Sequence, residues 1–97
     1  MQFVIHAYDK PNSLDLRVAN RPDHIDYVKA RGGGLLIAAP MIDEDGETPM
    51  GTVLIIEAEN KQEAEDFAAN DPYAKAGLFA EVRINSLTIT MNNTVAP

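Results

Sequence analysis

The pattern of hydrophobic and polar positions predicts four strands interrupted by helical segments. Runs with period-two alternation or almost wholly apolar character indicate strands, whereas apolar residues spaced three or four apart indicate helices. The expected elements, in chain order, are a strand at 3–8, a helical region at 14–31, strands at 35–39 and 52–58, a short helix between 60 and 71, a helical turn at 72–76, a strand at 78–90 and a loose tail at 92–97. In the region 14–31 the apolar residues available for burial are Leu14, Val18, Ile25 and Val28. Asn60, with Glu63 three residues later, predicts a capping box at the start of the short helix.

Glycine, proline and acidic residues mark the turns. Gly32-Gly33-Gly34 follows a helix and precedes a strand, so we interpret it as a helix end and not as a phosphate loop, which lies between a strand and a helix start. Segment 43–51 is acidic and contains Asp45-Gly46, a hairpin signal, without the twelve-residue pattern of a calcium loop. We expect a solvated turn there, and Pro40 predicts that strand 35–39 ends or lies at a sheet edge.

The segment Arg21-Pro22-Asp23-His24 contains both a proline, which constrains where a helix can begin, and a titratable histidine. Proline is tolerated in the first turn of a helix and poorly tolerated inside one. Pro22 is therefore expected to start or kink a helix, which puts His24 in its first turn. There the helix dipole favours the neutral imidazole, so a nitrogen is left to accept a proton.

The last predicted strand contains a change of phase. Val82 and Ile84 keep one alternation, whereas Leu87, Ile89 and Met91 keep the other. A bulge or bend near residues 85–86 would return all five to one buried face.

The order strand, helix, strand, strand, helix, strand is that of a ferredoxin-like split βαβ unit, an α+β fold with an antiparallel sheet and both helices on one face. The central strands are apolar on both sides, so the bare face would be a large exposed apolar patch. A second subunit packed sheet to sheet would cover it. We therefore expect residues 1–97 to form one domain that assembles as a homodimer.

Composition narrows the function classes. The net charge of −7 and pI near 4.6 argue against binding to nucleic acids or acidic membranes, which require basic surfaces. Cysteine is absent, and the two histidines with scattered acids form no convincing metal set. The sequence has no nucleotide fingerprint, signal peptide or bilayer-length apolar run, so we expect a cytoplasmic protein without a cofactor.

Two local features bear on a site around His24. Asp71 precedes Pro72, where it is well placed to cap the turn that follows. Arg17, Arg21 and Arg31 lie close to His24 in sequence. From the residues alone, these arginines are a solvated helix face.

The chain resembles the YciI-like (YCII-related) family over nearly its full length. The motifs that carry the resemblance are Asp9-Lys10, Arg17, Arg21-Pro22-Asp23-His24, Ala38-Ala39-Pro40, Gly51-Thr52, Asp71-Pro72-Tyr73 and Ala76-Gly77-Leu78-Phe79. Each is weak alone, but their order and spacing are fairly specific. Ala39 departs from the glycine usual in the family, and Thr52 from its common serine.

The resemblance implies a homodimeric α+β barrel with a cleft where His24 and Asp71 meet. It implies general acid–base chemistry, a proton abstraction of the lyase, dehydrochlorinase or isomerase kind, on a small organic molecule. Arg17 or Arg21 would bind a carboxylate or phenolate, and Tyr73 or Tyr27 would contact a ring.

Two other interpretations stay open. The His24–Asp71 pair could only tie two helices together, or the dimer could hold a metabolite or dock on a larger enzyme without turnover. A cavity beside the second nitrogen of His24 favours catalysis or ligand binding. Protein partners on both nitrogens favour the structural role.

Overall fold

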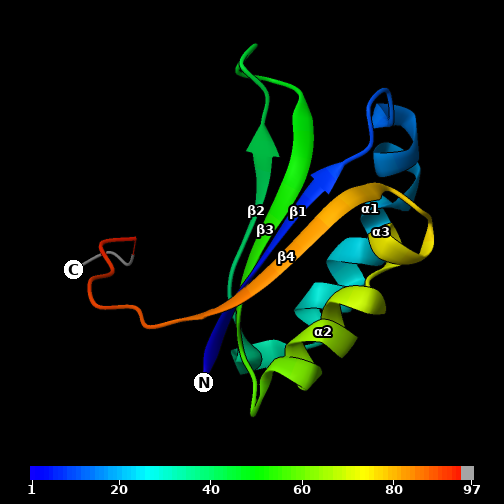
Figure 1. Cartoon of the computed structure of the whole chain (residues 1–97). Helices are drawn as coiled ribbons and strands as arrows, with labels where there is room; N and C mark the ends of the chain where they lie inside the picture. The colour runs from blue at the N-terminus through cyan, green and yellow to red at the C-terminus, as the bar shows by residue number, and fades with distance from the viewer. Residues whose placement is uncertain (95–97) are drawn as a thin grey trace.

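The chain folds into two layers, a four-stranded sheet and a layer of helices along one of its faces (Figure 1). The computed structural model describes residues 1–94. Its elements are β1 (Gln2–Asp9), α1 (Leu14–Lys29), a 3-10 turn (Gly32–Gly34), β2 (Leu35–Ile42), β3 (Pro49–Glu57), α2 (Lys61–Ala69), α3 (Pro72–Lys75) and β4 (Phe79–Leu87). The strand order is β2-β3-β1-β4 with antiparallel neighbours, which confirms the predicted ferredoxin-like α+β fold.

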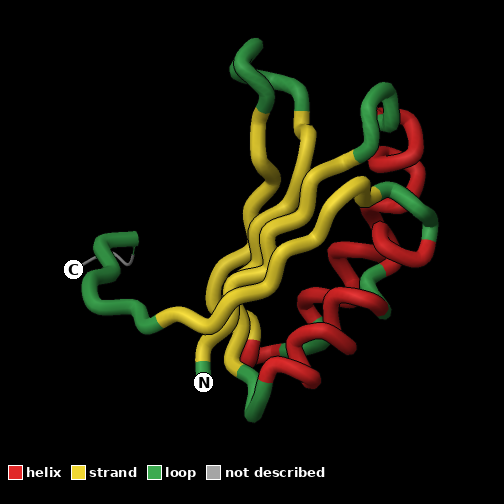
Figure 2. The backbone as a smooth tube through the Cα atoms, viewed as in Figure 1, coloured by secondary structure: helices red, strands yellow, loops and turns green. Residues whose placement is uncertain are grey.

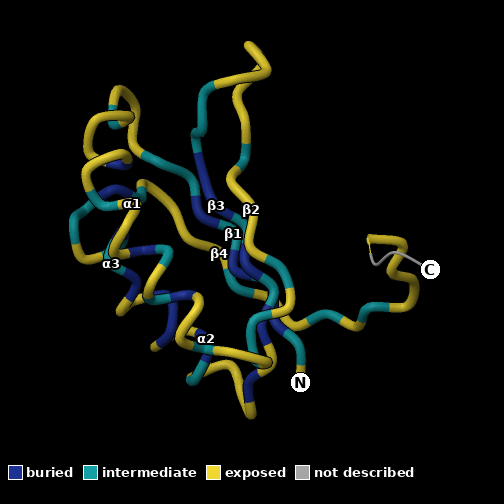
Figure 3. The backbone as a smooth tube through the Cα atoms, turned by 180° about the vertical axis from the view of Figure 1, so that it is seen from behind, coloured by how far each residue is buried: buried dark blue, intermediate teal, exposed yellow. Residues whose placement is uncertain are grey.

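The core lies between the sheet and the helices. Alternate residues of β1 and β3, among them Phe3, Ile5, Leu54 and Ile56, are buried against the helices. Their partners across the layer are apolar side chains of α1 and α2, and Figure 3 colours segments of both the sheet and the helices as buried. Each fully buried side chain of this size contributes about 1.5–3 kcal/mol, so the alternation in the sequence fixes which face meets the helices.

The other face of the sheet carries no helix (Figure 2). The strand register places Val4 beside Ile55 and His6 beside Val53 on this open face. Ile37 of the edge strand β2 pairs with Ile55. These side chains are half-buried, although no second layer within residues 1–94 covers them.

The structure corrects the expected position of His24. α1 is one helix from Leu14 to Lys29 with Pro22 inside it, so His24 lies past its middle and not in its first turn. An internal proline costs about 3 kcal/mol, but α1 buries Arg17 on one side of Pro22 and His24 and Val28 on the other. Tertiary contacts on both sides of the proline keep the helix continuous, and the dipole argument for a neutral His24 does not apply.

The predicted bulge near residues 85–86 is also wrong. β4 pairs regularly with β1 from Leu87 to Glu81, and its irregularity lies at Tyr8 and Asp9. Because β4 ends at Leu87, the later residues Ile89 and Met91 need not share a face with Val82 and Ile84. The strand therefore stops earlier than the expected range of 78–90, and part of the expected tail, residues 95–97, lies outside the described residues.

Smaller expectations agree with the structure. β2 is an edge strand that includes Pro40, and the glycine triplet follows the end of α1. Asn60 caps α2 by accepting a hydrogen bond from the Glu63 N–H. Within residues 1–94, no helix has both the length and the apolar character needed to cross a bilayer.

Candidate functional site

The side of α1 that faces the sheet carries polar side chains. Its buried residues are Arg17, His24 and Val28. Leu14 and Val18, which the apolar pattern assigned to burial, are 43% and 60% exposed. Because residues seven apart lie on one helical face, Arg17 and His24 point the same way, two turns apart.

His24 meets Asp71 in a buried pair. The Nδ1 atom of His24 lies 2.9 Å from both carboxylate oxygens of Asp71, and the two side chains are 7% and 2% exposed. A carboxylate accepts hydrogen bonds, so it places the imidazole proton on Nδ1. The Nε2 atom of His24 has no protein hydrogen-bond partner within the described chain, and His24 lines a cavity.

The position of Asp71 is fixed by a second contact, at the start of helix α3. Asp71 is the N-cap of α3, where its Oδ1 atom accepts a hydrogen bond of 2.9 Å from the Tyr73 N–H, and Pro72 follows at the first helical position, where proline is favoured. The sequence predicted this cap. The same carboxylate therefore orients both the start of α3 and the imidazole on α1.

The Tyr73 ring packs against His24. The two rings are stacked with their centroids 4.0 Å apart and an angle of 14° between their planes. Burial raises the pKa of Tyr73, the charges of Arg17 and Arg21 oppose that rise, and the Asp71 and Asp9 carboxylates add to it. Tyr73 is thus a neutral phenol at neutral pH and offers a hydrogen-bond donor.

The raised pKa of Tyr73 predicts a loss of stability at high pH. The unfolded phenol ionises near 10.0 and the folded one above it, so the unfolded state binds fewer protons as the pH rises through this window. The free energy of unfolding should therefore fall above pH 10. Denaturant titrations at several alkaline pH values measure this fall in the free energy of unfolding, which should be smaller in Tyr73→Phe. A fall of the same size in that variant would contradict the assignment. Tyr27→Phe is a useful comparison, because burial also raises the pKa of Tyr27.

A small cavity lies beside the stacked rings. Its volume is about 80 Å³, and the residues that line it come from α1, β2, β3 and α3: Arg17, Arg21, His24, Ile25, Ala38, Ala39, Pro40, Thr52 and Tyr73. Arg17, Arg21, His24 and Tyr73 thus line this cavity as predicted, and Asp71 lies behind His24. Tyr27, the other candidate for a ring contact, does not line it, and its hydroxyl donates to the Phe67 carbonyl at 2.8 Å. Drug-sized ligands occupy about 300–1,000 Å³, so this space suits a much smaller molecule.

The two predicted arginines differ in their surroundings. Arg17 is buried, and its Nε and Nη2 atoms already donate to Asp9 and Thr52. Arg21 is exposed and has no ion-pair or hydrogen-bond partner among residues 1–94. Asp9 and Thr52 were not assigned a site role from the sequence, although both stand in the motifs that carry the family resemblance.

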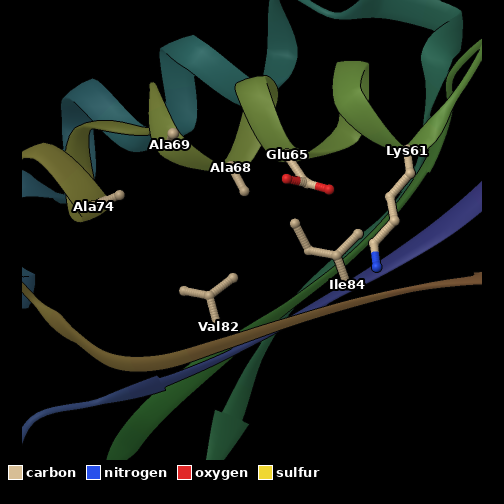
Figure 4. A pocket seen from close by; sticks show the side chains of 7 residues that line it. All are labelled: Lys61, Glu65, Ala68, Ala69, Ala74, Val82 and Ile84. Carbon is tan, nitrogen blue, oxygen red and sulfur yellow. The ribbon is translucent and has the colours of Figure 1, made fainter.

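A larger groove lies between α2, α3 and β4. Figure 4 shows its lining residues, Lys61, Glu65, Ala68, Ala69, Ala74, Val82 and Ile84, and its volume is about 450 Å³. Among residues 1–94, the charged groups that line it are Lys61 and Glu65, and none of its lining residues also lines the His24 cavity. In the described part of the chain, no three histidine, aspartate or glutamate side chains gather where they could hold a metal ion.

Comparisons with known proteins agree with the fold and the motifs. The model of the YCII-related domain matches residues 1–88. The chain belongs to the YCII-related family. An uncharacterized protein of Haemophilus influenzae is 40% identical over 89 residues, 84% of this chain and 91% of that protein. The Escherichia coli protein YciI is 35% identical over 91 residues, 87% of this chain and 93% of YciI.

A solved structure of the same fold has a described activity. It is the 5-chloro-2-hydroxyhydroquinone dehydrochlorinase TftG of Burkholderia phenoliruptrix, in complex with 2,5-dihydroxybenzoquinone. It is 33% identical to this YCII-related chain, with a TM-score of 0.83 over 91% of this chain and 94% of TftG. The family resemblance stated from the sequence is thereby confirmed.

Proposed function

We propose that this protein is an acid–base enzyme in which His24 and Asp71 move a proton on a small oxygenated ring. The observation that carries the proposal is the contrast between the two imidazole nitrogens. Nδ1 lies against the Asp71 carboxylate at 2.9 Å, while Nε2 has no protein partner within residues 1–94 and its side chain lines the cavity. The Asp71 carboxylate thus orients the imidazole through Nδ1, and Nε2 is available to a ligand.

The chemistry follows from that arrangement. Nε2 accepts a proton from a hydroxyl or activated C–H of the substrate, and the Asp71 carboxylate stabilises the positive charge that forms on the imidazole. In a dehydrochlorination the chloride leaves with the electron pair of the C–Cl bond, so that HCl is lost in total. In an isomerisation the imidazolium returns its proton to another substrate atom.

The relative TftG supports an oxygenated ring as the substrate class, since its structure contains 2,5-dihydroxybenzoquinone. The cavity offers matching groups: the Tyr73 phenol, the Thr52 hydroxyl and the Arg21 guanidinium. A net charge of −7 repels anions at long range, so a phenolate or carboxylate would depend on local arginine charge.

Arg21 gives a prediction about binding. Arg21→Ala should weaken the affinity for 2,5-dihydroxybenzoquinone, which is anionic at neutral pH, by roughly 10-fold, because a charge-assisted hydrogen bond contributes about 1.5 kcal/mol or more. Calorimetric titration measures the change. Lys29→Ala, which removes an exposed positive charge from the same helix outside the cavity, should bind like the natural chain. Equal affinities for all three proteins would exclude Arg21 as the anion-binding group.

The activity itself can be tested with the purified chain. We would incubate it with 5-chloro-2-hydroxyhydroquinone and measure chloride release and the quinone absorbance. Release above the rate of buffer and of a His24→Gln protein supports the proposal. Binding of 2,5-dihydroxybenzoquinone without chloride release from any chlorinated hydroxyhydroquinone would indicate a binding module, and the absence of both would leave the His24–Asp71 pair a structural tie.

We also propose that the protein is a homodimer formed through the open face of the sheet. Val4, Val53 and Ile55 lie on that face by register, and the face carries no helix (Figure 2). A contiguous apolar surface of this kind, left uncovered on a protein, often marks an interaction site. A second copy presents the same surface, so the contact closes on itself as a two-fold interface. The cytoplasmic location stays a prediction of the sequence.

A further inference from the structure

Arg17 is fixed by three hydrogen bonds before any ligand arrives. Its Nε donates to Asp9 Oδ2 at 2.7 Å, and its Nη2 donates to Asp9 Oδ1 at 3.2 Å and to Thr52 Oγ1 at 2.7 Å. The Arg17 and Asp9 side chains are 6% and 7% exposed. A planar guanidinium held by a two-point carboxylate contact has little freedom to turn. Only its Nη1 group remains for other contacts.

The fixed guanidinium lies over the Tyr73 ring. The Cζ atom of Arg17 is 4.7 Å from the ring centroid, and the imidazole of His24 stacks on the same ring at 4.0 Å. Arg17 and His24 are seven residues apart on α1, about 10.5 Å along the helix axis. The stacked imidazole already covers one face of the Tyr73 ring, so a guanidinium carbon only 4.7 Å from the same centroid has room over the opposite face. The two groups flank the ring, and Tyr73 is held between them.

We propose that Asp9, Arg17 and Thr52 are positioning residues for His24, acting through the Tyr73 ring. This inference rests on the proposed function, because it explains how the base is oriented. Asp71 fixes the direction in which Nδ1 points. The Tyr73 ring, pressed from its other face by the Arg17 guanidinium, fixes the plane of the imidazole and hence the direction of Nε2. The family resemblance implies that Arg17 or Arg21 binds the substrate. In this proposal Arg17 positions the histidine, and Arg21 binds the substrate.

Two central strands anchor this arrangement. Asp9 ends β1 and Thr52 belongs to β3, which pair with each other in the sheet. The imidazole plane is thus tied to the sheet through β1, β3, Arg17 and Tyr73, and to α3 through Asp71. A shift of about 1 Å in a reacting group can lower a rate by on the order of 100-fold, so a tie of this kind matters for catalysis even where it adds little to stability.

The experiment compares Arg17→Met, Arg17→Lys, Asp9→Asn and Thr52→Val with Arg31→Met. Arg31 is a matched control outside the cavity, since its Cζ also lies over an aromatic ring, that of Phe67 at 4.6 Å, and its Nη2 pairs with Glu63 at 2.9 Å. The first readout is the set of imidazole ¹⁵N and ¹H signals of His24 in the protein without ligand. The second is the alkaline absorbance titration of the tyrosines.

We expect the His24 signals to move or broaden in the Arg17 variants and in Asp9→Asn, and to stay in place in Arg31→Met. Arg17→Met should also raise the pKa of Tyr73 further, because the Arg17 charge lowers it, whereas Arg17→Lys keeps that charge. With a chlorinated hydroxyhydroquinone as substrate, kcat should fall by on the order of 10- to 100-fold in Arg17→Lys, with KM little changed.

Several results would overturn the proposal. His24 signals that stay unchanged in Arg17→Met would show that the stack does not hold the imidazole. A KM that rises with kcat unchanged would make Arg17 a substrate-binding residue. Unfolding of both Asp9→Asn and Thr52→Val would show that the cluster supports the fold and not the histidine. If the His24 signals move but the natural chain releases no chloride, the positioning role stands and the proposed function fails.

Discussion

Replacing His24 with glutamine should lower kcat for the proposed proton transfer by roughly 10²- to 10⁴-fold, the usual contribution of a positioned acid–base group. Glutamine keeps an amide N–H that can donate to Asp71 but has no nitrogen that takes up a proton near neutral pH. The substrate cavity is otherwise kept, so KM should change much less than kcat. Steady-state rates of chloride release measure both.

The fold of this variant is its main control. Asp71 keeps its hydrogen bond from the Tyr73 N–H, so the loss in unfolding free energy should be about 1–3 kcal/mol, the cost of disturbing one buried polar contact. Asp71→Asn should also reduce kcat, because an amide no longer compensates the imidazolium charge. Full activity in His24→Gln would remove the base from the mechanism. Loss of folding in that variant would support the interpretation of the pair as a tie between helices.

Replacing Ile55 with aspartate should dissociate the homodimer. Ile55 lies on the open face beside Val4 and Ile37, at the centre of the proposed contact between two sheets. The two-fold interface would then bury two carboxylates without partners, and burying an unpaired charge costs several kcal/mol. Light scattering at micromolar concentration should therefore report a monomer mass in place of a dimer mass.

Val18→Asp is the matched control for that test. It makes an equivalent change at a residue that is 60% exposed on α1, in the helix layer, and should leave the dimer intact. An unchanged dimer in Ile55→Asp would contradict the open face as the interface. A natural chain that is monomeric at the same concentration would contradict the dimer itself.

The strands and their order could be predicted because they rest on short-range patterns. Alternation along β1 and the apolar run of β3 are preserved in the sheet, since a shift by one residue would expose every core side chain. The caps at Asn60 and Asp71 were predictable for the same reason: an acceptor just before a helix start has a local physical role. From these elements and their order, the ferredoxin-like arrangement follows.

The site was less predictable because polar side chains occupy buried positions, where the hydrophobic pattern leads one to expect apolar residues. Arg17 and His24 occupy the inward face of α1, so apolar periodicity favoured Leu14 and Val18 for burial in their place. The prediction that Pro22 puts His24 in the first turn of a helix was wrong. It considered the sequence around Pro22 alone and not the tertiary contacts that Arg17 and Val28 make on either side of the proline. The Arg17–Asp9–Thr52 contacts join three elements, and they became visible only once β1, β3 and α1 were placed together.

The central claim is that Asp71 holds the imidazole proton on Nδ1 and leaves Nε2 open to the cavity. The most direct measurement is a long-range ¹H–¹⁵N spectrum of His24 in its neutral form, recorded for the natural chain with and without 2,5-dihydroxybenzoquinone. We predict a protonated Nδ1, an unprotonated Nε2, and a ligand-induced shift confined to Nε2. A proton on Nε2 in the neutral ring would contradict this claim, and so would His24 signals that do not shift at saturating ligand.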